Sequence, residues 1–149
     1  MACLVDTNCF VRIADKNSPL RPVVLDAFKK LRSQNHDLYI TPQVISEFWN
    51  VCTRPVTSRG GLGFTPQRTG QKVELIRKHF TVLPDNLDTF EEWLGLVAHH
   101  SVSGAKVHDA KFVASMIVHG IQDLITFNTN DFARFDTIRA IDPRDLGNA

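Results

Sequence analysis

The chain contains 149 residues, of which 43% are hydrophobic, and its 17 Lys and Arg residues nearly balance its 16 Asp and Glu residues. This size and composition predict one globular domain over residues 1–149, with a core that needs neither disulfides nor a structural metal. A charged content of 22% and a mean hydropathy of -0.12 exclude a disordered chain and a membrane protein.

The start of the chain and its cysteines indicate the compartment. A short apolar run reaches Asp6 without a basic leader, so we expect no targeting segment and a cytoplasmic protein. Cys3, Cys9 and Cys52 are odd in number and form no Cys-x-x-Cys pair. This pattern favours reduced, buried thiols over a disulfide framework or a zinc site.

Short apolar runs alternate with amphipathic segments along the chain. In chain order the sequence predicts a strand at Ala2–Val5, a helix over 22–34, a strand at 38–40, a helix capped by Thr41 and begun by Pro42, a loop over 55–65, a helix over Pro66–His79, a strand at 80–83, a helix over 87–100, a helix that follows Val107 and ends at Gly120, and strands at 124–126 and 138–141. The predicted loop contains three glycines in four positions, which a helix or strand does not sustain.

This alternation predicts an α/β fold, a doubly wound parallel sheet with helices on both faces. In such sheets ligands bind beyond the carboxyl ends of the strands, where the strand order reverses. Candidate functional residues are therefore sought after the ends of strands.

Four acids follow a strand end or begin a helix. Asp6 follows the first strand, Glu47 lies on the helix after the second, Asp109 lies in the first turn of a helix, and Asp131 follows a later strand. Each has a structural alternative: Asp6 is a good helix cap, Glu47 can emerge at a rim, Asp109 suits the helix macrodipole, and Asp131 suits a turn. Taken together, they share one end of the predicted sheet.

Clustered carboxylates repel one another unless cations lie between them. Oxygen-rich ligand sets suit Mg²⁺ or Mn²⁺ better than zinc. The separations along the chain mean that only the fold can bring the four acids together. Histidines do not offer an alternative set, because His99 and His100 are adjacent and His108 merely precedes an acid.

Four short motifs occur in order along the chain: Val5-Asp6-Thr7-Asn8, Ile45-Ser46-Glu47-Phe48-Trp49, Val107-His108-Asp109-Ala110 and Thr126-Phe127-Asn128-Thr129-Asn130-Asp131-Phe132. Their order and spacing resemble the PIN-domain family, and the chain looks like a VapC-type ribonuclease toxin of a toxin–antitoxin pair. The stretch from Thr53-Arg54-Pro55 to Gly61-Leu62-Gly63 is similar to one VapC subgroup.

The resemblance implies catalytic and metal-ligand roles for Asp6, Glu47, Asp109 and Asp131. Supporting polar roles fall to Thr7, Asn8 and Asn128. Asn128 and Asn130 compete with Asp131 for the fourth position of the set, which varies most within the family. The implied reaction is metal-assisted hydrolysis of RNA phosphodiester bonds, in which the carboxylates hold Mg²⁺ or Mn²⁺.

Partners follow from the same resemblance and from charge. Six bases and one acid lie between Arg54 and Lys78, and we expect the RNA to be bound by Arg54, Arg59 and Arg68 of this basic, glycine-rich region. As structural alternatives, the bases would lie on solvated helix faces and the glycine-rich segment would be an ordinary flexible connection. The family implies a cognate antitoxin, with an arm across the acidic crevice, and a homodimer.

Two other functions compete with the ribonuclease. A catalytically silent PIN-like module would bind RNA or protein, although it need not keep four acids. A structure-specific DNA nuclease of similar architecture usually carries further acids and DNA-binding helices, for which 149 residues leave little room.

Overall fold

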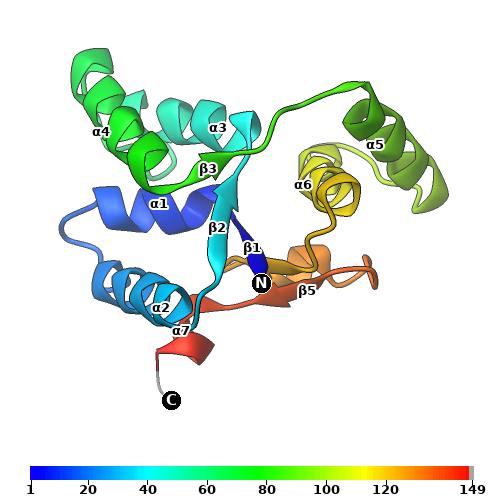
Figure 1. The fold of residues 1–149 in the computed structure, drawn as a ribbon. Coiled ribbons are helices and arrows are strands. Elements are labelled where there is room, and N and C mark those ends of the chain that lie inside the picture. Colours follow the sequence, from blue (N-terminus) through cyan, green and yellow to red (C-terminus); the bar gives the residue numbers. More distant parts are fainter. Residues whose placement is uncertain (148–149) are drawn as a thin grey trace.

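The computed structural model describes residues 1–147, which form a five-stranded sheet in the order β3-β2-β1-β4-β5 (Figure 1). Every neighbouring pair of strands is parallel. The strands are β1 (Ala2–Val5), β2 (Asp37–Ile40), β3 (Thr81–Val82), β4 (Asp123–Ile125) and β5 (Arg139–Ile141). The chain moves outward from β1 to β2 and β3, then returns to the other side of β1 with β4. The predicted doubly wound α/β sheet is therefore confirmed, and its order reverses between β1 and β4.

Helices cover both faces of this sheet. Figure 1 shows α1 (Thr7–Ala14) and α2 (Arg21–Ser33) on one side and α5 (Leu87–His99) and α6 (Lys106–His119) on the other. The remaining helices are α3 (Pro42–Thr53), α4 (Pro66–His79), the short α7 (Pro143–Leu146) and the 3-10 helix η1 (Thr129–Phe132). Within residues 1–147, none of the helices is both long and apolar enough to cross a bilayer.

Local signals set most of these boundaries. The Thr41 side chain accepts a hydrogen bond from Val44 N at the start of α3, and Thr65 caps α4 in the same way. Gly120 ends α6 in the left-handed conformation that favours glycine. The predicted helix over Pro66–His79 is confirmed to the residue. The helices α1 and α7 and the turn η1 are missing from the predicted series, because each is short.

The central strand β1 is buried between neighbours on both sides. Leu4 and Val5 are fully buried and pair with Leu124 and Ile125 of β4. The core continues into the helices, where Phe48 and Phe112 are the largest fully buried side chains. The expectation for the cysteines is confirmed, since Cys3, Cys9 and Cys52 are all buried free thiols.

Leu4 should therefore contribute strongly to stability. Leu4→Ala removes a fully buried side chain and leaves a cavity, so we expect the free energy of unfolding to fall by about 2–5 kcal/mol. Leu75→Ala is the matched control, because Leu75 is 58% exposed and should change stability by less than about 0.5 kcal/mol. Urea unfolding measures both, and equal losses would contradict this account of the core.

Candidate functional site

Asp6 lies at the point where the strand order reverses. Its backbone N–H donates to the Ile125 carbonyl of β4 at 2.9 Å. Its side chain caps α1, with Oδ1 accepting from Thr7 N at 2.7 Å, and Oδ2 accepts from the Thr126 hydroxyl at 2.7 Å. The helix-cap alternative for Asp6 is thus correct, and it coexists with a place at the predicted crevice. The two carboxylate oxygens are thus fixed by groups from different segments, one at the start of α1 and one just after β4.

The electrostatic surroundings of Asp6 disfavour its charge. Burial raises the pKa of the Asp6 carboxyl to about 6, against the opposing effect of the hydrogen bonds from Thr126 and Thr7. The charges of Glu47 and Asp109 raise this pKa further. Three acids separated along the chain therefore interact at one end of the sheet.

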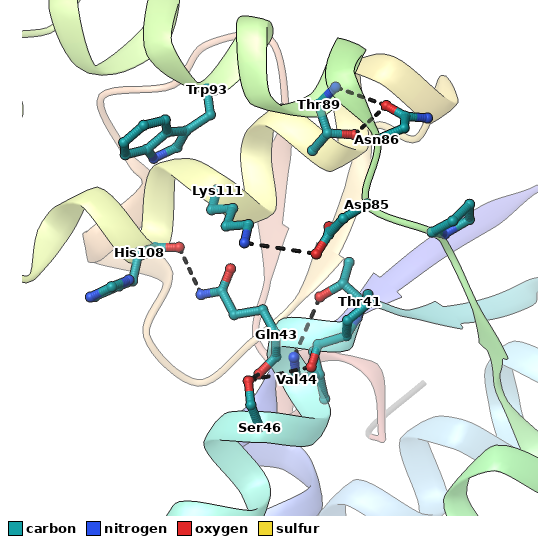
Figure 2. Close-up of polar contacts among 12 residues, drawn as sticks. Thr41, Gln43, Val44, Ser46, Asp85, Asn86, Thr89, Trp93, His108 and Lys111 are labelled. Atoms are coloured by element: carbon teal, nitrogen blue, oxygen red, sulfur yellow. Dashed lines mark hydrogen bonds and ion pairs between the residues drawn. The ribbon is translucent and has the colours of Figure 1, made fainter.

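Glu47 is held on α3 by two polar neighbours. Its Oε2 accepts from the Thr7 hydroxyl at 2.8 Å, and its Oε1 accepts from Gln43 Nε2 at 2.7 Å. The same amide nitrogen of Gln43 donates to the His108 carbonyl of α6 at 2.9 Å (Figure 2). Glu47 thereby belongs to a polar link that joins α1, α3 and α6.

Asp109 and Asp131 are less alike than the sequence suggests. Burial and the charge of Asp131 raise the pKa of the half-buried Asp109 carboxyl, while Lys106 opposes the shift. Asp131 Oδ1 lies 2.5 Å from Lys106 Nζ, whereas Asp109 Oδ2 lies 3.9 Å from it. Asp131 therefore lies at the rim of the site and pairs with Lys106. Asn128 lines the crevice in its place.

The crevice between these residues has a volume of about 450 Å³. Its lining contains both acidic and basic side chains. It includes eight of the residues predicted for function: Asp6, Thr7, Asn8, Glu47, Arg54, Arg59, Asp109 and Asn128. The structure thus brings together three of the four predicted acids and all three predicted supporting polar residues.

Two lining residues were missed by the sequence interpretation. Arg12 lies one helical turn after Asn8 on α1, and Asn50 lies one turn after Glu47 on α3. Helical spacing of three or four residues from a candidate site residue was the signal that could have identified both.

Arg68 does not line this crevice. Its guanidinium Cζ lies 3.9 Å from the ring centroid of Phe64, in a separate groove that includes Lys16 and Leu62. The structure therefore divides the three predicted RNA-binding arginines into a pair at the crevice and one residue elsewhere.

The fit of a metal ion depends on the oxygen donors. Residues 1–147 contain no ready-made group of three or more His, Cys, Asp or Glu side chains that could hold an ion. Mg²⁺ usually binds through one or two carboxylates and keeps several waters. Asp6 and Glu47 are anionic donors that form no salt bridge within the described part of the chain. This donor chemistry fits a hydrated Mg²⁺ or Mn²⁺.

Comparison with known proteins identifies the family. The PIN domain profile matches residues 3–138, so the chain belongs to the PIN domain family. A search of curated protein sequences finds no match.

Solved structures share the fold at low sequence identity. A VapBC2 structure from Rickettsia felis, bound to a promoter DNA fragment, superposes with a TM-score of 0.70 and 14% identity over 95% of this chain and 98% of that chain. DNA-bound VapBC from Salmonella typhimurium gives 0.69 and 19% over 96% and 98%. The sarcin-ricin loop cleaving toxin VapC20 from Mycobacterium tuberculosis gives 0.62 and 17% over 89% and 95%.

Asp6 should make the stability of the metal-free protein depend on pH. Its folded-state pKa of about 6 lies above the unfolded value of about 3.9, so the folded state holds the proton more tightly. The stability from this group is full below about pH 4 and is lost as pH rises through about 6, on the order of 3 kcal/mol in all. Asp6→Asn should abolish this loss. Urea unfolding in EDTA across this pH range tests the difference, and parallel profiles for both proteins would refute it.

Proposed function

We propose that the protein is a metal-dependent endoribonuclease that hydrolyses RNA phosphodiester bonds, and that it is the toxin of a VapBC-type pair. One observation carries the proposal: Asp6, Glu47 and Asp109 interact electrostatically at the crevice where the strand order reverses. Placing like charges together opposes folding unless a cation compensates them. A divalent ion would supply that compensation. A polyanionic substrate would then give the occupied site its use.

Asp6 and Glu47 would hold the ion, and Asp109 would complete its carboxylate set. When bound, Mg²⁺ or Mn²⁺ supplies Lewis-acid activation of water and of the scissile phosphate. The chain's own groups orient the ligands: Thr126 holds Asp6, and the Thr7 hydroxyl holds Glu47. This positioning reduces the reorganisation needed when charge develops on the phosphate.

Two residues are candidates for the fourth metal-donor position. Asp131, paired with Lys106, would act from the rim directly or through water, whereas Asn128 lines the crevice itself. Asn8 supports the central acid, because its Nδ2 donates to the Thr126 hydroxyl at 3.1 Å. Arg54 and Arg59 line the same crevice, where phosphates of the RNA would bind.

Partners are proposed from the structural relatives. The Rickettsia and Salmonella structures are VapBC complexes bound to DNA, which supports a cognate antitoxin for this chain. The homodimer is proposed from the family resemblance alone. VapC20 is described as cleaving the sarcin-ricin loop, which supports RNA as the substrate class. An antitoxin arm across the crevice would compete with RNA for the same charged side chains.

A catalytically silent PIN-like binding module is the competing function. Such a module gains nothing from the buried charge of Asp6, which only disfavours its folded state near neutral pH. The ribonuclease uses that charge, so the observed site favours it.

Cleavage should require the metal and the acids. The unchanged protein should cut structured RNA in Mg²⁺ but not in EDTA, and Asp6→Asn and Asp109→Asn should each lower the rate by at least about 100-fold. Asp26→Asn on the exposed surface of α2 is the control and should cut normally. Mg²⁺ should also raise the melting temperature of the unchanged protein and not that of Asp6→Asn.

Two outcomes would overturn the proposal. Equal cleavage by Asp109→Asn would remove the carboxylate site from the mechanism. The protein would be assigned to the silent binding module if it bound RNA, did not cleave it, and showed no Mg²⁺-dependent shift in melting temperature.

A further inference from the structure

The glycine-rich segment 54–63 has one hydrogen-bonded conformation, although its composition predicts a flexible connection. Gly61 N donates to the Ser58 carbonyl at 2.8 Å, and Gly63 N donates to the Arg54 carbonyl at 2.8 Å. The bond between Gly63 and Arg54 joins the two ends of the segment, and the bond between Gly61 and Ser58 closes a turn within it. Its backbone is therefore shaped before any ligand arrives.

The segment is also attached to α3. Leu62 N donates to the Val51 carbonyl at 3.1 Å, and Phe64 N donates to the Cys52 carbonyl at 2.7 Å. Gly61 packs so closely that an added Cβ would lie 2.3 Å from the backbone oxygen of Pro55. No side chain fits there without a shift of the backbone.

Arg59 stands at the tip in an unfavourable conformation for its residue type. Its φ is 38°, and that of the following Gly60 is 71°. Two positive φ values within the hydrogen-bonded turn from Ser58 to Gly61 match a type I′ turn, which favours Asn, Asp or Gly at both central positions. Backbone preference does not account for an arginine here, so the role of this residue lies in its side chain.

Three guanidinium groups line the same crevice as the carboxylates. Arg54 and Arg59 come from the segment, and Arg12 comes from α1. Arg54 is positioned within the segment, because its Nη1 donates to the Arg59 carbonyl at 3.1 Å. Within residues 1–147 none of the three forms a salt bridge. The crevice therefore offers positive charge that no ion pair within residues 1–147 engages.

We propose that Arg12, Arg54 and Arg59 form a preorganised clamp for a phosphate that flanks the cleaved bond of RNA. The proposal rests on the ribonuclease function proposed above, but binding at the clamp requires no metal. Guanidinium groups bind phosphate oxygens through paired N–H donors, and a rigid frame lowers the entropy lost on binding. The clamp would hold one phosphate while the neighbouring phosphate reaches the acids, whose negative charge a divalent ion would offset.

The clamp is tested by RNA binding in EDTA, with anisotropy of a fluorescein-labelled single-stranded RNA as the measurement. Arg12→Ala, Arg54→Ala and Arg59→Ala should each weaken binding about tenfold or more and reduce the slope of log K against log salt by about 0.7. Lys78→Ala, which removes one exposed charge from α4, should leave the affinity and the slope close to those of the unchanged protein. Equal affinity for all three arginine variants and the unchanged protein would overturn the clamp.

Two further variants separate charge from conformation. Arg59→Asn suits the left-handed backbone, so it should lose affinity as Arg59→Ala does while its melting temperature does not fall. Gly61→Ala keeps every charge but displaces the segment, and should weaken RNA binding about tenfold. Gly95→Ala is its control, since an added Cβ there meets nothing within 4 Å. Normal RNA affinity of Gly61→Ala would refute preorganisation.

The clamp and the nuclease can fail separately. RNA that binds through the three arginines in EDTA but is never cut in Mg²⁺ supports the clamp and refutes the proposed catalysis. RNA that is cut in Mg²⁺ while the arginine variants bind normally supports the catalysis and refutes the clamp.

Discussion

The rest of the site depends on a buried carboxylate at the junction of two parallel strands. Asp6 directly follows β1, caps α1 and accepts a hydrogen bond from Thr126, which directly follows β4. These contacts position the charge but do not fully compensate for its burial, since its pKa remains raised to about 6. The fold therefore contains a charged group whose best environment is completed only by a ligand.

Other polar contacts extend from that group. Thr7, the first residue of α1, bonds Glu47 on α3, and Gln43 continues the link to the start of α6. Figure 2 shows the part of this link between Gln43 and His108, beside the ion pair in which Lys111 Nζ lies 3.7 Å from Asp85 Oδ2. The acids are thus carried by elements joined to one another, so their relative positions are fixed by the fold rather than by loops.

The division of charge within the crevice gives the site its chemical character. Of the lining carboxylates, Asp6 follows a strand, Glu47 lies within α3 and Asp109 lies in the first turn of α6. The guanidinium groups come from α1 and the segment before α4. A net charge of +1 for the whole chain conceals this arrangement. The carboxylates suit a hard cation and the guanidinium groups suit phosphate, which is the combination that phosphodiester hydrolysis uses.

Sequence patterns determined much of this protein. Hydrophobic periodicity, helix caps and prolines placed the strands and the longer helices, and the alternation of both predicted the parallel sheet and the edge where ligands bind. The motifs around Asp6, Glu47 and Asp109 named residues that the crevice contains. Only the tertiary structure decided that Arg68 packs on Phe64, that Asp131 pairs with Lys106, and that Arg12 lines the crevice. Local signals reflect hydrogen bonds and burial within a few residues, whereas these contacts join distant segments whose approach is set by the packing of the whole chain.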